Sequence, residues 1–254
     1  MEDKVTIAIV SALVGSVVTF FSNYIIPVFF IERIKDRRSS LKLFYRCSAP
    51  IIHSSYLLIR RLQNIIDEKN HIALSESWQP KPHWPMTNEY FVESTIYLFG
   101  LYFAALEKFE ADSMHLLSEG KNYKALFELI KNTRRALYDV SLNTDRIFDF
   151  QVYLMEQKAI GDLFLSDKND FKVISYSEFM LSMKNEEHFI RVMSPIKKLI
   201  INISNGDNDF RMIRLSKFRE ELKGLHNFLA KSLHSNVYNI NEAIRLDGES
   251  RKRG

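Results

Sequence analysis

Pairs of basic residues, several with an aromatic residue nearby in the sequence, form the pattern in this chain that could bind a ligand. Lysine and arginine hold phosphate groups, and the bases of a single-stranded nucleic acid stack on aromatic rings. For each pair taken alone, a solvated helix face is the commoner explanation. The candidate ligand-binding residues are Arg60, Arg61, Lys131, Arg134, Arg135, Lys197, Lys198, Arg211 and Arg214.

The sequence contains no pattern typical of a catalytic or metal site. The glycines form no phosphate-binding loop, the histidines have no metal-ligand spacing, and there is no HExxH motif. Cys47, the single cysteine, has no neighbouring base and is expected to be a small buried side chain. The acidic pairs Glu107–Glu110 and Asp145–Asp149 have helical spacing, which usually leaves such pairs in solvent. We therefore expect a protein that is not an enzyme and that uses no metal or cofactor.

A row of small and hydroxylated residues near the N-terminus is the second feature with a chemical use. On a helical wheel the row falls within an arc of about 140°, and bulky apolar residues fill the rest. Its members are Ala8, Ser11, Ala12, Gly15, Ser16, Thr19, Ser22 and Asn23. Hydroxyl groups can line a water-filled pore without the cost of a buried charge, but the same face can also pack against another helix. The sequence does not decide whether this row lines a pore or packs against another helix.

This row lies in a segment, Val5 to Ile31, that carries no charged residue. As a helix the segment is about 40 Å long, more than the roughly 30 Å of a bilayer core. Residues 32–46 then carry six basic and two acidic residues, which accounts for the whole formal net charge of +4. The positive-inside rule predicts a single membrane span with the N-terminus outside and the residues from Glu32 onward in the cytoplasm. A cleaved signal peptide, the competing interpretation, needs a basic start and a shorter apolar run.

Beyond this segment, helical periodicity and scarce glycine and proline predict an all-α protein, with an N-terminal transmembrane helix followed by a cytosolic multi-helix bundle. The expected parts are a transmembrane helix at 1–31, a basic juxtamembrane helical segment at 32–70, a Pro/Trp-rich connection at 71–87, a cytosolic helical bundle at 88–235 and a flexible basic tail at 236–254. In the connection, Trp78 and Trp84 either plug the bundle or contact a partner or the membrane surface.

Within the bundle we expect helices at 88–117, 122–138, about 145–164 and 175–203, with a short strand near 172–175. The last of these helices starts at a capping box of Ser175 and Glu178 and should bend at Pro195. A final helix carries an apolar seam that either packs inside the bundle or pairs with a second copy. The seam consists of Leu215, Phe218, Leu222, Leu225 and Leu229.

Three stretches of the chain resemble a loosely related set of bacterial single-span helical membrane proteins, most of which have no assigned function. The stretches are NEYFVESTIYLFGLYFAALEKF from Asn88, EQKAIGDLF from Glu156 and KVISYSEF from Lys172. The shared segment has the form E-Q-x-A-I-G. A structural role for it would be a tight helix contact at Gly161, with Gln157 hydrogen-bonded inside the bundle.

In layout and size the chain also resembles the membrane effector of Hailong-type anti-phage systems. This resemblance implies a homo-oligomeric channel of the bacterial inner membrane, such as a tetramer, with a periplasmic N-terminus. The channel would be held shut by a single-stranded DNA oligomer that a partner nucleotidyltransferase makes. The resemblance also implies membrane depolarisation when phage infection removes that ligand. We therefore expect a channel or pore-forming effector of an anti-phage (abortive infection) system, gated by a cytosolic nucleic-acid or nucleotide ligand. The alternative is a membrane-anchored helical adaptor that recruits a cytosolic partner and conducts nothing.

Overall fold

The computed structural model confirms the all-α class. It describes residues 14–21, 26–68, 70–80, 86–113, 121–142, 150–167, 171–203 and 209–232. The chain divides into two units, Met1–Arg46 and Cys47–Gly254. In the described residues the strand structure is one short antiparallel pair, β1 (Leu165–Asp167) with β2 (Lys172–Val173). The short strand expected near 172–175 is present at 172–173, whereas its partner β1 was not expected.

The first unit is helical at residues 14–21 and again where α2 (Ile26–Ile66) begins. The segment expected to cross the membrane, 5–31, overlaps both helical stretches, and its other residues lie outside the described part of the chain. Among the helices that are described, none has both the length and the apolar content needed to cross a bilayer.

The second unit is a helical bundle. The later part of α2 enters its core through side chains such as Ile51, Leu58 and Leu62, so the bundle extends further toward the N-terminus than the expected range of 88–235. Its other helices are α3 (Asn88–Ser113), α4 (Lys121–Ala136), α5 (Leu154–Phe164), α6 (Tyr176–Asn185), α7 (Glu187–Ile200) and α8 (Phe210–Ser232), with the short 3₁₀ turns η2 (Asn70–Leu74) and η4 (Val140–Leu142).

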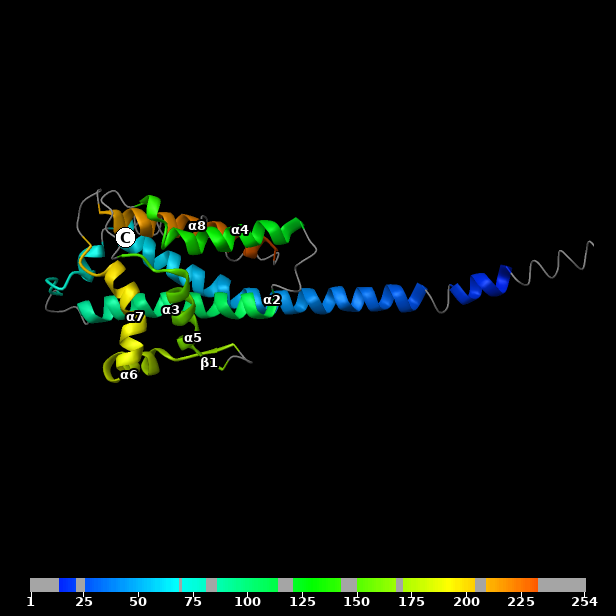
Figure 1. Cartoon of the computed structure of the whole chain (residues 1–254), viewed down its shortest axis with the longest axis horizontal. Helices are drawn as coiled ribbons and strands as arrows, with labels where there is room; N and C mark the ends of the chain where they lie inside the picture. The colour runs from blue at the N-terminus through cyan, green and yellow to red at the C-terminus, as the bar shows by residue number, and fades with distance from the viewer. Residues whose placement is uncertain are drawn as a thin grey trace, which may run out of the picture. The chain divides into compact units, whose positions relative to one another are not determined.

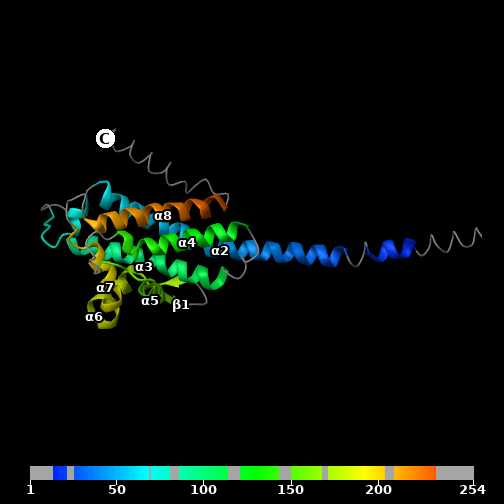
Figure 2. The same cartoon turned by 45° about the horizontal axis from the view of Figure 1, so that its top comes forward.

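Two helix pairs organise this bundle. Helix α3 packs against α5, and α4 packs against α8, which runs beside it in both views of the chain (Figures 1 and 2). Gly161 of α5 allows the first contact to be close, because a Cβ built there would lie 2.9 Å from the backbone oxygen of Phe103. At Gly100 of α3, an added Cβ would collide with the ring of Phe164.

The helix starts expected at Asn88 and at Ser175 are confirmed. Helix α3 begins at Asn88, where the amide of Tyr90 donates to Oγ1 of Thr87 (3.1 Å). The amide of Glu178 donates to Oγ of Ser175 (3.2 Å), and the amide of Ser175 donates to Oε2 of Glu178 (2.7 Å). This reciprocal pair is the predicted capping box, and α6 starts directly after it.

Two of the expected helix boundaries are wrong. The helix expected from about 145 starts only at Leu154, and the preceding residues that are described, 150–153, are not helical. Its start is set by Glu156, whose carboxylate accepts from the amide of Tyr153 (2.7 Å), while the amide of Val152 donates to the carbonyl of Leu137 (3.0 Å).

The helix expected at 175–203 is two helices, because the backbone of Glu186 is extended between α6 and α7. Oγ of Ser182 donates to the Glu186 carboxylate (2.6 Å), which ties the end of α6 to this break. Pro195 lies inside α7.

The apolar seam of α8 packs inside the bundle, as one of the two alternatives predicted. All five of its side chains are fully buried, and the ring of Phe218 stacks on Phe99 of α3 (centroids 5.5 Å apart). Cys47 is buried, as expected. Trp78 packs edge-on against Phe91 (5.7 Å), whereas Trp84 and the tail at 236–254 lie outside the described residues.

Candidate functional site

Three members of the small-residue row, Gly15, Ser16 and Thr19, lie in the described helical stretch at 14–21. Oγ1 of Thr19 donates to the carbonyl of Gly15 (2.7 Å), so this hydroxyl is satisfied within its own helix. A Cβ built on Gly15 would meet no atom within 4 Å. The other members of the row, Ala8, Ser11, Ala12, Ser22 and Asn23, lie outside the described residues.

The bulky residues of the same stretch are exposed. Val14, Val17, Val18, Phe20 and Phe21 each expose between 51% and 57% of their surface. Contiguous exposed apolar surface of this kind marks contact with lipid or with another protein. The small residues Gly15, Ser16 and Thr19 of the same stretch are exposed as well.

Arg134, one of the candidate ligand-binding residues, is held inside the bundle. Its guanidinium donates to Glu107 (2.6 Å) and to both carboxylate oxygens of Glu110 (3.2 and 2.9 Å), and its side chain is 5% exposed. Burial by itself lowers the pKa of Arg134, but Glu110 and Glu107 more than reverse this effect, and the pKa is raised. Glu107 and Glu110 were expected in solvent, and that expectation is wrong because they are the partners of this buried cation.

Arg211 and Arg214 of α8 are also used by the bundle. Arg211 pairs with Asp209 (2.8 Å), donates to the carbonyls of Ile201 and Asn202, and lies over the ring of Phe150 (4.7 Å to the centroid). Arg214 is 1% exposed and donates to the carbonyls of Ala136 (3.3 Å) and Asp139 (3.1 Å). Burial lowers the pKa of Arg214.

The other candidate basic residues lie in different surroundings. On α4, Lys131 and Arg135 are exposed and pair with Glu128 (3.4 Å) and Asp139 (3.2 Å). Arg61 of α2 lies over the ring of Phe91 (5.7 Å), and beside it Arg60 is half-buried. Lys197 and Lys198 of α7 are exposed. The nine candidate residues are thus distributed over four helices, α2, α4, α7 and α8.

The E-Q-x-A-I-G segment has the structural role expected from the sequence. Nε2 of Gln157 donates to the carbonyls of Arg134 (3.0 Å) and Val152 (2.8 Å), and Gln157 is fully buried. Gly161 makes the close contact with α3 described above. The segment therefore joins α5 to α3 and to the end of α4.

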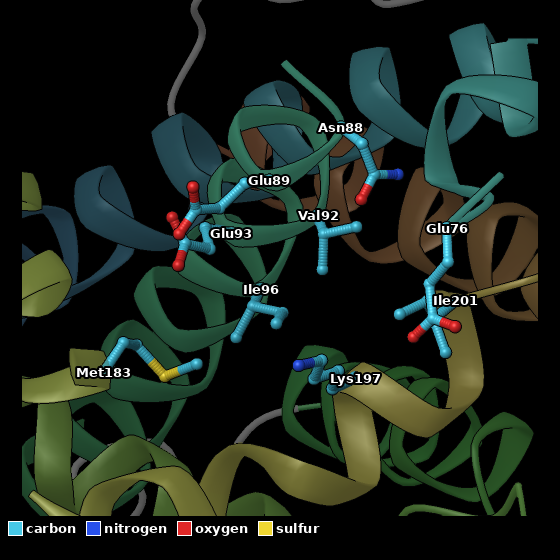
Figure 3. A pocket seen from close by; sticks show the side chains of 9 residues that line it. All are labelled: Glu76, Asn88, Glu89, Val92, Glu93, Ile96, Met183, Lys197 and Ile201. Carbon is cyan, nitrogen blue, oxygen red and sulfur yellow. The ribbon is translucent and has the colours of Figure 1, made fainter. Parts of the chain in front are cut away.

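An acidic pocket that the sequence did not indicate lies between α3, α6, α7 and the loop after η2. Its volume is about 180 Å³, and it is lined by three carboxylates, those of Glu76, Glu89 and Glu93, and by the amine of Lys197. Figure 3 shows Glu89 and Glu93 next to each other on one side of the pocket and Glu76 on the opposite side. Apolar side chains of Val92, Ile96, Met183 and Ile201 complete the lining.

Glu93 is the buried member of this acidic set. It is 9% exposed, and within the described part of the chain its Oε2 has no hydrogen-bond partner. Burial, with a further contribution from the neighbouring Glu89, raises the pKa of Glu93 above its ordinary value, while Lys184 and Lys197 oppose the change. Neutral Glu93 therefore favours folding at low pH, and this contribution is lost as the pH rises through the raised pKa.

Two asparagines hold the loop that carries Glu76. Nδ2 of Asn88 donates to the carbonyls of Ala73 (2.8 Å) and Ser75 (2.9 Å), and Oδ1 of Asn202 accepts from the amide of Glu76 (2.9 Å). Asn202 has a φ of 53°, a left-handed conformation that asparagine tolerates better than most residues. These bonds fix one rim of the pocket to both α3 and the end of α7.

One signal in the sequence could have indicated this pocket. Glu89 and Glu93 are four residues apart on one helix, a like-charge spacing that is unfavourable unless something else compensates it. Among the described residues, no group of histidine, cysteine and acidic side chains is arranged to hold a metal ion. No protein-family model, curated protein or solved structure matches this chain.

Proposed function

We propose that this protein is a homo-oligomeric channel or pore-forming effector of the bacterial inner membrane, in which residues 5–31 of each copy surround a shared pore. The N-terminus would be periplasmic and the helical bundle cytoplasmic. A role in anti-phage defence by abortive infection is the biological setting that the resemblance in layout to Hailong-type effectors supports.

The observation that carries this proposal is the exposed apolar surface at residues 14–21. Five large apolar side chains on this short helical stretch expose more than half of their surface. They lie in an uncharged segment and are followed by the basic residues of 32–46. The sorting of bulky residues and small hydroxylated residues onto different faces of this exposed stretch supports a helix with one lipid-facing side and one side that meets other copies or water.

The channel proposal is tested by electrical recording of the full-length protein in planar bilayers. Thr19→Leu and Ser16→Leu, on the small-residue face, are expected to change the single-channel conductance by about twofold or more, because each narrows a pore lined by those positions. Val18→Leu, on the bulky face, is the matched control and should leave the conductance unchanged. If the small-residue variants conduct like the wild type, the pore assignment is wrong.

The adaptor alternative predicts a different result in the bilayer recordings and in a replacement of the span. An adaptor gives no current above that of protein-free bilayers, and it keeps its cellular function when residues 5–31 are replaced by an unrelated span. A channel loses its function in that exchange.

Gating by a cytosolic nucleic acid is the second part of the proposal. Since Arg134, Arg211 and Arg214 are engaged inside the bundle, the contacts to phosphate are proposed for exposed residues of α4, namely Lys131 and Arg135. These residues border acidic neighbours, and a cavity of about 260 Å³ beside Arg135 is also lined by Asp139, Lys217 and Glu221. A bound phosphate therefore has to displace local ion pairs.

Binding of short single-stranded oligonucleotides to the full-length protein in detergent tests this second part. The double variant Lys131→Ala/Arg135→Ala is expected to weaken binding and to lower the slope of log affinity against log salt by about 1.4, at roughly 0.7 per phosphate contact. Lys231→Ala, an exposed residue at the end of α8, is the control. An unchanged salt slope in the double variant would contradict the placement of the ligand on α4.

A further inference from the structure

The acidic pocket described above has the features of a binding site for a small molecule. Its volume of about 180 Å³ is far larger than the roughly 10–15 Å³ that one water needs, and smaller than the 300–1,000 Å³ typical of drug-sized ligands. Its rim is held in place by Asn88 and Asn202. The ligand is therefore expected to be a compact molecule that binds to a pocket whose rim is already held in place.

The charge of the pocket specifies a cation. Three carboxylates face one amine, so the lining carries an excess of negative charge. Glu93 is the strongest sign that something is to be bound, because it is 9% exposed and its Oε2 has no hydrogen-bond partner among the described residues. A buried carboxylate oxygen without a donor is costly, and an ammonium group would supply the missing donor.

The arrangement of the carboxylates specifies two cationic groups and not one. Figure 3 shows Glu89 and Glu93 on one side, Glu76 on the opposite side, and the apolar side chains of Val92 and Ile96 between them. Two negative ends separated by an apolar stretch match a flexible chain of methylene groups with an amine at each end.

We propose that this pocket binds a short linear diamine, with one ammonium at Glu89 and Glu93, the other at Glu76, and the methylene chain against Val92 and Ile96. Lys197 offsets part of the negative charge of the lining and competes with the diamine for the carboxylates. Because every lining residue belongs to the second unit, this inference does not rest on the proposed channel. Loss of diamine binding and loss of conductance are separate measurements.

Isothermal titration calorimetry of the full-length protein in detergent tests the proposal, with putrescine as the probe. Glu93→Gln and Glu89→Gln are each expected to weaken putrescine binding by about tenfold, since each removes a charged acceptor. Glu220→Gln, an exposed residue of α8 outside the pocket, is the control and should bind as the wild type does. Glu93→Gln should also melt at a higher temperature than the wild type, which separates lost binding from lost folding.

Lys197 provides a variant with the opposite sign. Lys197→Met is expected to tighten putrescine binding by roughly fivefold or more, because it removes a like charge from the pocket. Lys198→Met, the adjacent exposed lysine that does not line the pocket, should have no effect.

Three results would overturn the proposal. The first is putrescine binding that the glutamate and Lys197 variants leave unchanged. The second is equally tight binding of n-butylamine, which has a single ammonium and would make the pocket a site for one cation. The third is a magnesium chloride control of matched ionic strength that gives the same heat as putrescine. The heat would then come from general screening of the carboxylates and not from binding of a diamine.

Discussion

Gly161→Ala is expected to lower the free energy of unfolding by about 1–3 kcal/mol, the usual cost of adding a methyl group to a well-packed contact. The added Cβ would lie 2.9 Å from the backbone oxygen of Phe103 and 2.7 Å from Cγ of Glu107. The glutamate side chain can move, but the backbone of α3 cannot do so without disturbing the buried residues on either side of it. Urea-induced loss of helical circular dichroism of the full-length protein measures the change.

Gly224 of α8 is the matched control for this prediction. A Cβ built there meets Cδ2 of Leu129 at 3.4 Å, an ordinary contact distance. Gly224→Ala should therefore raise the free energy of unfolding by about 0.5–1 kcal/mol, the benefit of replacing glycine inside a helix. If both variants change stability in the same direction and by the same amount, the tight contact of α5 with α3 is not what makes glycine necessary at position 161.

Arg134→Met is expected to cost about 3–5 kcal/mol, the largest single-residue effect that we predict for this chain. The substitution keeps a flexible, unbranched stem, although a shorter one, and removes the cation between Glu107 and Glu110, whose side chains are 16% and 21% exposed. The two carboxylates would then face each other without a counter-charge. Thermal and urea unfolding of the full-length protein measure the loss.

Two further variants separate the ion cluster from general damage to α4. Arg135→Met, at the next position, removes an exposed arginine paired only at the surface and should cost no more than about 1 kcal/mol. The triple variant Glu107→Gln/Arg134→Met/Glu110→Gln removes all three charges together and should recover most of the stability that Arg134→Met loses. A triple variant as unstable as Arg134→Met would show that the charges are not the cause.

The parts of the fold that could be predicted from the sequence depend on local signals. The capping box at Ser175, the start of α3 at Asn88 and the apolar seam of α8 each involve residues within a few positions of one another. Such signals act through the geometry of a single helix, which a sequence displays directly.

The parts that could not be predicted depend on contacts between distant positions. The start of α5 is set partly by the bond from Val152 to Leu137, and Arg134 finds its two acidic partners on α3. The sequence therefore does not distinguish an exposed basic residue, such as Arg135, from a buried one, such as its neighbour Arg134. The acidic pocket has the same origin, since Asn202 holds the loop of Glu76 from 126 positions away.

The enclosure of the Glu107–Arg134–Glu110 cluster has a practical consequence for experiments at different ionic strengths. Dissolved ions screen charges at the surface far more strongly than charges enclosed by protein. Concentrated salt that strips a polyanion from exposed lysines and arginines should therefore leave this internal cluster intact. Dissociation under those conditions can then be interpreted as release of the bound molecule from a bundle that is still folded.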